Sequence, residues 1–217
     1  MLKKTKIDWC DCTLNPVVGC KRNCKYCYAR KINDRFHFVE DWTKPQFFPE
    51  RLKALKSKKP QSIFMDSMSD ISFWEKDWLN NVFKQMQKNT QHNYIFLTKD
   101  SLPDNFISND IKEFVFLGLT IDHQLATASI SNAFDFLSIE PLLEPIKLDY
   151  SEQNENIKLI IIGAETGNRK GKIIPEKKWI DDLVEYADRN RIAVFMKESL
   201  RKIMGDDFRQ DRLLWQK

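Results

Sequence analysis

The sequence predicts an α/β fold made of repeated β–α units around a parallel sheet. Short runs of apolar, β-branched and aromatic residues alternate with longer polar or amphipathic segments along the chain. The apolar runs are continuously hydrophobic, which is typical of strands covered on both faces. No repeat, low-complexity linker or break in composition divides the 217 residues. We therefore expect a single domain over residues 1–217.

The expected elements follow one another in a regular order. The expected strands cover residues 14–18, 62–66, 94–98, 114–120, 134–139, 159–163 and 193–197. The expected helices cover residues 25–37, 49–58, 75–89, 123–131 and 175–190. The last helix has Pro175 in its first turn, followed by Glu176, which is a good start signal. Such a series forms either an open doubly wound sheet or a barrel, and periodicity alone does not separate the two.

Three cysteines with the spacing C-x3-C-x2-C, Cys20, Cys24 and Cys27, are the most informative feature of the chain. The chain holds five cysteines, and this triplet should arise by accident on the order of once in several hundred such chains. Soft sulfur ligands select zinc or an iron–sulfur cluster over calcium or magnesium. The spacing therefore predicts a metal centre.

The number of cysteines in this loop separates the possible centres. Structural zinc sites and ordinary electron-transfer [4Fe–4S] clusters both take four ligands, and no second cysteine pair follows Cys27. A loop with three cysteines would leave one iron of a [4Fe–4S] cube open to a small molecule. The alternative is a zinc-stabilised loop completed by Cys10, Cys12 or a histidine.

The spacing, together with Tyr26 before the last cysteine, resembles the cluster loop of the radical S-adenosylmethionine (SAM) enzymes. The resemblance implies a partial (β/α)6-type TIM barrel with the cluster loop after the first strand, and the order of the expected elements favours this barrel. It also implies a [4Fe–4S] cluster on the three cysteines, with Tyr26 flanking the adenine of SAM. Such enzymes cleave SAM to a 5′-deoxyadenosyl radical.

Polar residues at the carboxyl ends of the expected strands are the next candidates, because active sites of such sheets and barrels lie there. Asp66, Ser67 and Ser69 follow the second strand, where many radical SAM enzymes hold the SAM amino group with a Gly-Gly-Glu-like segment. They offer hydrogen-bond partners for an ammonium, although a turn or helix cap explains them equally well. Thr120 and Asp122 follow the fourth strand and could hold the SAM ribose, with capping as the ordinary alternative for Asp122.

The later strands add three groups at the same rim. Glu140 follows the fifth strand and precedes Pro141, and we take it as the best candidate for a catalytic carboxylate. Gly163 permits close approach of a ligand, and Glu165 would lie near the mouth of the site. Lys197 follows the last strand as a further catalytic candidate, with a buried salt bridge as the alternative.

Several segments also resemble a narrower group, the phage- and prophage-associated three-cysteine family DUF5131. They are residues 7–9 (IDW), 15–20 (NPVVGC), 24–29 (CKYCYA), 137–142 (LSIEPL) and 163–167 (GAETG). The family tends to have other residues in place of Cys10 and Cys12, which implies that these two are dispensable. Some members are encoded beside a three-Cys-motif protein, which makes such a protein a candidate partner.

The favoured function is a radical SAM enzyme of unknown substrate that takes electrons from an external donor. The alternative is a metal-stabilised module that binds nucleic acid or protein without catalysis. The formal net charge of +4 is too small to establish a nucleic-acid partner. Two basic groups would nevertheless suit a nucleotide or nucleic-acid substrate. They are Arg51, Lys53, Lys56, Lys58 and Lys59, and Arg169, Lys170 and Lys172.

The beginning of the chain, MLKKTK, is basic but lacks the apolar stretch of a secretory signal. No long apolar run occurs elsewhere, so we expect no membrane partner. The odd number of cysteines agrees with free thiols in a reducing compartment. We therefore expect a cytoplasmic protein.

Overall fold

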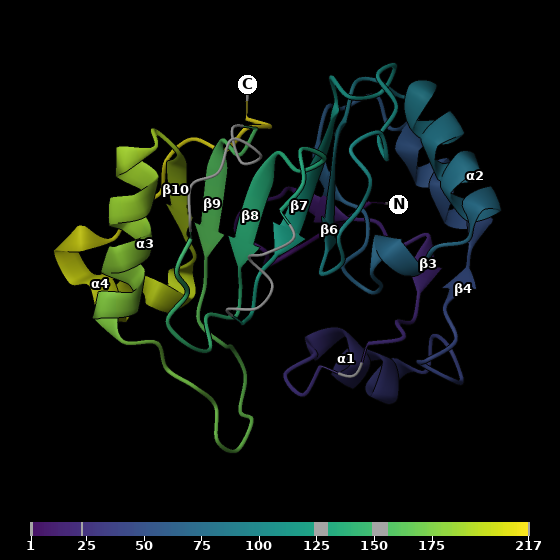
Figure 1. Cartoon of the computed structure of the whole chain (residues 1–217). Coiled ribbons are helices and arrows are strands. Elements are labelled where there is room, and N and C mark those ends of the chain that lie inside the picture. Colours follow the sequence, from purple (N-terminus) through teal and green to yellow (C-terminus); the bar gives the residue numbers. More distant parts are fainter. Residues whose placement is uncertain (1, 23, 124–129, 149–155, 217) are drawn as a thin grey trace. The chain divides into compact units, whose positions relative to one another are not determined.

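The computed structural model describes residues 2–22, 24–123, 130–148 and 156–216 (Figure 1). The chain groups into two compact units, the first made of residues 1–98 and 107–116 and the second of residues 99–106 and 117–217. Strands alternate with helices in both units, as the sequence predicts. The single domain over residues 1–217 stays a prediction.

The first unit contains a mostly parallel set of strands and a separate small hairpin. Its strands are β1 (Lys3–Lys4), β2 (Cys12–Thr13), β3 (Val17–Val18), β4 (Gln46–Phe47), β5 (Ser62–Phe64) and β6 (Asn93–Thr98). β2, β5 and β6 lie side by side and parallel, and β1 pairs with β2 in the antiparallel sense. β3 and β4 form an antiparallel pair of their own.

The expected strand over residues 14–18 is wrong, because the chain divides there into β2 and β3. Pro16 lies between them and has no N–H with which to continue a ladder. Asn15 lies between the two strands, and its Oδ1 accepts a hydrogen bond from the backbone N–H of Met68 at 3.0 Å. The first strand of the parallel set is therefore β2, and β3 leads the chain into the cysteine loop.

The helices of the first unit differ in type. α1 (Tyr28–Phe36) and α2 (Lys76–Gln87) are α-helices and confirm two of the expected helices, with shorter ends. The expected helix at residues 49–58 is a 3-10 helix, η1 (Pro49–Lys56), as the Arg51 N–H to Phe48 carbonyl bond of 3.1 Å illustrates. A second 3-10 helix, η2 (Ile71–Phe73), was not expected.

The second unit contains a parallel set of four strands. They are β7 (Val115–Thr120), β8 (Phe136–Ile139), β9 (Leu159–Ile162) and β10 (Ala193–Met196), paired in chain order. β8 and β9 are buried at every position, as expected for strands covered on both faces. The pairing places Ile139, Ile162 and Met196 level with one another. The next residues of the three strands therefore emerge together at the carboxyl edge.

Helices of the second unit follow its last two strands. α3 (Lys177–Arg189) precedes β10 and packs on it (Figure 1). It begins two residues after Pro175, and Glu176 is its N-cap residue. A short segment after β10 comprises η5 (Glu198–Leu200), α4 (Arg201–Met204) and η6 (Gly205–Asp207). The expected helix at residues 123–131 lies mostly outside the described residues.

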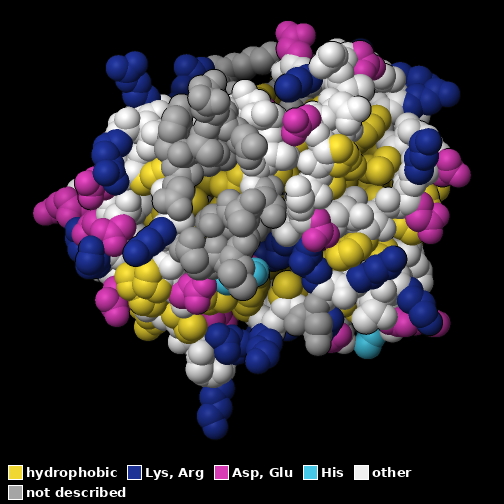
Figure 2. Space-filling model, in the orientation of Figure 1, with side chains coloured by type: hydrophobic (Ala, Val, Ile, Leu, Met, Phe, Trp, Pro, Cys, Tyr) yellow, Lys and Arg dark blue, Asp and Glu magenta, His cyan; other side chains and the backbone are white. Residues whose placement is uncertain are grey.

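The surface carries both signs of charge. On the face drawn in Figure 2, Lys and Arg side chains are interspersed with Asp and Glu side chains, in keeping with the small net charge. No helix of the described part of the chain is long and apolar enough to cross a membrane.

Candidate functional site

Gly19 sets the path of the chain into the cysteine loop. Its φ is +107°, and a Cβ there would stand 2.9 Å from Pro45 Cα and 3.0 Å from the Trp42 carbonyl oxygen. Backbone bonds hold both sides of this turn, from Gly19 N–H to Met68 O at 3.0 Å and from Cys20 N–H to Trp42 O at 2.8 Å. Only glycine combines this φ with such close backbone approach.

The three cysteines precede α1 in the chain. Cys20 is buried, and Cys24 and Cys27 are half-buried. Backbone N–H groups point at two of the sulfurs, from Arg22 to Cys20 Sγ at 3.4 Å and from Arg30 to Cys27 Sγ at 3.3 Å. Cys27 is the N-cap residue of α1, so the positive end of the helix dipole lies at its thiol.

Apolar packing surrounds the loop and controls the acidity of its thiols. A small cluster of buried residues, including Val18, Val39, Trp42 and Met68, contains Cys20, and Cys27 packs against it. The pKa of Cys20 is raised to about 12, mainly by burial and further by Asp70, Cys24 and Cys27. Burial likewise raises the pKa of Cys27. Because metals bind thiolates, loading the loop must release these protons.

Three cysteine thiols on one loop have the donor chemistry to hold an iron–sulfur cube. The part of the chain that the structure describes holds no group of three or more His, Cys, Asp or Glu side chains around one metal-ion position. A [4Fe–4S] cube takes each thiolate on a different iron. Cys20, Cys24 and Cys27 are the residues that would hold it.

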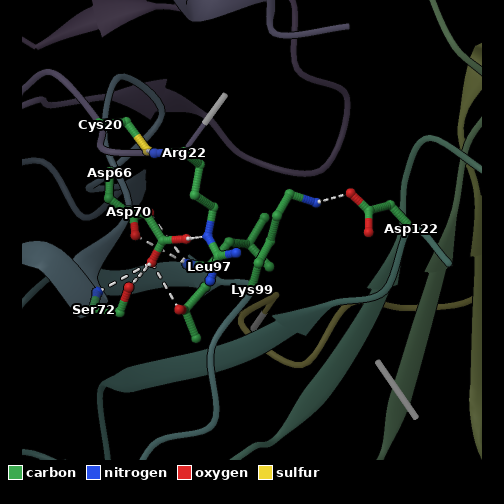
Figure 3. A network of polar contacts seen from close by, with 9 residues as sticks. Cys20, Arg22, Asp66, Asp70, Ser72, Leu97, Lys99 and Asp122 are labelled. Carbon is green, nitrogen blue, oxygen red and sulfur yellow. Dashed lines mark hydrogen bonds and ion pairs between the residues drawn. The ribbon is translucent and has the colours of Figure 1, made fainter. Parts of the chain in front are cut away.

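Asp70 anchors this loop to the neighbouring strand ends, and Figure 3 shows it at the centre of a polar network. Its carboxylate accepts from Arg22 Nε at 3.2 Å, from Thr98 Oγ1 at 2.7 Å and from Ser72 Oγ at 2.8 Å. Asp70 is 5% exposed, so these contacts lie in a region of low dielectric. Arg22 stands between the first two cysteines, and its ion pair with Asp70 therefore fixes the loop itself.

The residues predicted to hold the SAM amino group lie beside Asp70 in the chain. Asp66 is buried, both its oxygens accept from the Leu97 N–H, and burial together with Asp70 raises its pKa well above the ordinary value. Ser67 Oγ donates to Asn15 Oδ1 at 3.0 Å, and Ser69 Oγ accepts from Trp74 Nε1 at 3.0 Å. Both hydroxyl oxygens retain capacity to accept a further bond.

The first two tyrosines of the loop differ in exposure. Tyr26 is half-buried between two of the cysteines, and Tyr28 is exposed. The Tyr28 hydroxyl donates to the Ser67 carbonyl at 3.0 Å, which ties the start of α1 to the segment after β5.

In the second unit, Asp122 lies two residues beyond β7 in an ion-pair group. Its Oδ2 is 2.9 Å from Lys99 Nζ, and its Oδ1 is 2.6 Å from His123 Nδ1 (Figure 3 labels Lys99 and Asp122). Thr120 is buried at the end of β7. The two predicted ribose ligands, Thr120 and Asp122, are thus two positions apart in the sequence. The Asp122 carboxylate contacts both Lys99 and His123.

Glu140 and Lys197 form an ion pair across the ends of β8, β9 and β10. Gly163, the residue that follows β9, lies against this pair. A Cβ at Gly163 would be 3.0 Å from Lys197 Cδ and 3.1 Å from Glu140 Cγ. The aliphatic stems of these two side chains therefore approach Gly163 closely. The close approach of a ligand to Gly163 stays a prediction.

Glu165 is held within the loop between β9 and α3. Its oxygens accept from Arg169 Nε at 2.6 Å and Nη2 at 2.7 Å, and the carboxylate is buried. These hydrogen bonds from Arg169 are the main cause that lowers the pKa of Glu165. A bidentate pair of this kind fixes orientation as well as charge.

Sequence reasoning did not identify Arg22 and Asp70 as site residues. Asp70 belongs to the polar run after the second expected strand, and Arg22 lies inside the cysteine motif, but 48 positions separate the two. The sequence does show that Asp70 belongs to a polar run after a strand and that Arg22 lies between two predicted metal ligands. Neither observation predicts that the two side chains contact each other.

Comparison with protein families finds one matching family model, described as "Protein of unknown function (DUF5131)", over residues 4–204. Among curated proteins, nothing matches this chain.

Comparison with solved structures finds spore photoproduct lyase. A cysteine-to-serine mutant of that enzyme has a TM-score of 0.63 and 10% sequence identity, over 91% of this chain and 79% of the other. A double mutant with bound AdoMet and a dinucleoside spore photoproduct has a TM-score of 0.62 and 9% identity, over 90% and 78%. At such identity the likeness concerns the fold. It confirms the predicted class, an α/β protein of the partial (β/α)6-barrel type.

Proposed function

The chain belongs to the DUF5131 family, and from its own residues we propose that it is a radical SAM enzyme. The single observation that carries this proposal is the spacing of Cys20, Cys24 and Cys27 on one loop, with no second cysteine pair after Cys27. Such a set suits a [4Fe–4S] cluster with one open iron. The fold shared with an enzyme whose structure holds AdoMet supports the same function.

When bound, the cluster would supply the one electron that cleaves the SAM sulfonium into methionine and a 5′-deoxyadenosyl radical. The protein holds the reactants and keeps water away. The apolar cluster around Cys20 and Cys27 would limit solvent access to the metal centre. Gly19 and the Arg22–Asp70 pair would keep the loop in place before and after loading.

Roles toward SAM follow from the hydrogen-bonding capacity of each candidate. In the first unit, we propose Ser67 and Ser69 as acceptors for the SAM amino group, because both hydroxyl oxygens can accept another bond. Asp66 would add a buried carboxyl beside them, and Tyr26 would flank the adenine. In the second unit, Thr120, Asp122, Gly163 and Glu165 stay predictions for cofactor binding.

Glu140 and Lys197 are the proposed catalytic residues. Their side chains are 23% and 15% exposed, so each is partly desolvated while still reachable. A substrate phosphate or carboxylate could pair with Lys197, and a substrate hydroxyl or amino group could donate to Glu140. The pair would thus open toward a polar ligand at the carboxyl edge of β8 to β10.

The substrate class is proposed to be a nucleotide or nucleic acid. The similar lyase structure contains a dinucleoside, which supports this class for a shared fold. Two of the basic residues already have partners within the protein. Arg51 donates a hydrogen bond to the Asn15 carbonyl at 2.7 Å, and Arg169 forms an ion pair with Glu165. The lysines of the two basic groups are exposed, and we propose that they supply the phosphate contacts: Lys53, Lys56, Lys58, Lys59, Lys170 and Lys172, the last of which also donates to the Gly167 carbonyl at 3.4 Å.

The proposal places the protein in the reducing cytoplasm, because the three cysteines must stay free thiols in order to hold a cluster. It also requires an external electron donor, and a three-Cys-motif protein is a further candidate partner.

The proposal is tested by SAM cleavage. Protein reconstituted anaerobically with iron and sulfide and reduced with dithionite should form 5′-deoxyadenosine and methionine in equal amounts. Alanine at Cys20, Cys24 or Cys27 should abolish this product. Serine at both Cys10 and Cys12 is the matched control and should leave it intact.

An intact cluster without SAM binding or cleavage would overturn the enzymatic proposal. The result would favour a metal-stabilised binding module instead.

A further inference from the structure

α1 carries an unusual concentration of exposed apolar side chains. Among the described residues, six large hydrophobic side chains are exposed, and four of them lie on α1 or just after it. These four, which we call the α1 patch, are Tyr28 (49% exposed), Ile32 (37%), Phe36 (58%) and Phe38 (41%). Exposed apolar residues gathered in this way mark interaction sites more often than scattered ones do.

The patch is held outward by the way α1 packs on the first unit. Ala29 and Asn33 are the buried residues of the helix, four positions apart on one face. Asn33 is fixed there, because its side chain exchanges two hydrogen bonds of 3.0 Å with the Val39 backbone. Tyr28, Ile32 and Phe36 follow the same four-residue spacing on the neighbouring face, which this packing leaves uncovered.

Basic residues flank the patch. Lys31 and Arg35 are exposed and one turn apart, and the Arg35 guanidinium lies 5.1 Å from the Phe36 ring centre. Residues 20–38 contain six basic residues and only one acidic residue, Asp34. The whole chain has a net charge of only +4, so positive charge is concentrated in this segment. An acidic partner would complement it.

The patch also begins where the candidate metal centre ends. Tyr28, its first member, directly follows Cys27, which caps α1. A partner that binds Tyr28 therefore contacts the residue next in sequence to the proposed ligand Cys27.

We infer that the α1 patch is the docking surface for a small acidic electron-transfer protein that reduces the cluster. The inference rests on the proposed function, since each SAM cleavage takes one electron from the cluster and the donor protein is oxidised when it gives that electron to the cluster. The aromatic side chains of the patch, with Arg35 against Phe36, would anchor the partner. Exposed basic residues such as Lys31 would attract its acidic surface. An electron donor must bind close to the cluster ligand Cys27, whereas a second copy of the chain or a lipid surface has no such requirement. The position of the patch therefore favours an electron donor.

The experiment uses the full chain, reconstituted with its cluster, and two probes, an acidic flavodoxin and an acidic ferredoxin. Binding is measured by calorimetry at low and high salt, and SAM cleavage is driven either by the reduced probe protein or by dithionite. The variants are Phe36→Glu and the double reversal Lys31→Glu with Arg35→Glu. Their matched controls are Ile174→Glu, at a side chain that is 68% exposed, and Lys84→Glu with Lys88→Glu, an exposed pair one turn apart at α2.

Both test variants should bind the probe at least tenfold more weakly, and protein-driven SAM cleavage should fall with binding. Dithionite-driven cleavage and both controls should stay at the wild-type level. Wild-type protein that binds neither probe, or test variants that bind like wild type, would overturn the inference. A dimer that Phe36→Glu dissociates, or binding to anionic phospholipid vesicles that it abolishes, would assign the patch to those occupants instead. Absence of dithionite-driven cleavage in wild type would refute the proposed function separately, and the binding data would still decide the docking surface.

Discussion

Asp70 is the residue whose contacts reach furthest into the candidate site. It joins Arg22 of the cysteine loop, Thr98 at the end of β6 and Ser72 of η2 through one buried carboxylate. An amide at this position could still accept from the two hydroxyls but could not neutralise the guanidinium. The charge of Asp70 is therefore specific to holding the cysteine loop.

We predict that Asp70→Asn weakens retention of the cluster by about tenfold, as expected when a group that orients metal ligands is altered. The free energy of unfolding of the apo protein should fall by about 2 kcal/mol. Iron content after gel filtration and denaturant unfolding measure the two effects. Ser72→Ala is the control, because it removes one hydroxyl from the same carboxylate and leaves the ion pair. Equal loss in both variants would show that the ion pair has no special role.

The Glu140–Lys197 pair can be separated into structural and functional contributions by a double-mutant cycle. Glu140→Gln leaves a partly buried lysine without its partner, and should lower the free energy of unfolding by about 1–2 kcal/mol. Adding Lys197→Met should restore most of this stability. SAM cleavage should stay impaired in the double variant. Recovery of cleavage along with stability would mean that the pair only anchors the strand ends.

At the scale of elements, the loop between β9 and α3 depends on the Glu165–Arg169 pair. Because the folded-state pKa of Glu165 is lowered, the pair stabilises the fold at pH values above the ordinary glutamate pKa of 4.5. This contribution is lost as the pH falls through the lowered folded-state pKa. Arg169→Met should therefore lower the melting temperature at about pH 7, and the difference from wild type should shrink by about pH 3.5. A difference that is constant with pH would contradict this account.

The elements that the sequence predicted best are the buried strands of the second unit. Residues 159–162 are apolar at every position and sit between two parallel neighbours, so local pattern and tertiary environment agree. The strand at residues 14–18 failed because apolar composition outweighed Pro16 in the prediction. The helix predicted at residues 49–58 is present, and it is a 3-10 helix. An amphipathic pattern does not distinguish this type from an α-helix.

The candidate site was predictable where its residues are close in sequence. The spacing of the cysteines identifies the loop, and the polar residues after each strand identify the carboxyl edges. Contacts between distant residues were not accessible, as the Arg22–Asp70 pair and the position of Gly163 against Glu140 and Lys197 show. Such contacts depend on how the strands are arranged, which the one-dimensional pattern does not contain.

For the whole molecule, the central claim is one [4Fe–4S] cluster on three cysteines with an iron open to SAM. The most direct test is electron paramagnetic resonance of the anaerobically reconstituted, reduced protein before and after addition of SAM, together with metal analysis. We predict about four irons per chain and a cluster spectrum that shifts when SAM binds the open iron. Stoichiometric zinc with no iron uptake, or a cluster spectrum that SAM leaves unchanged, would contradict the account.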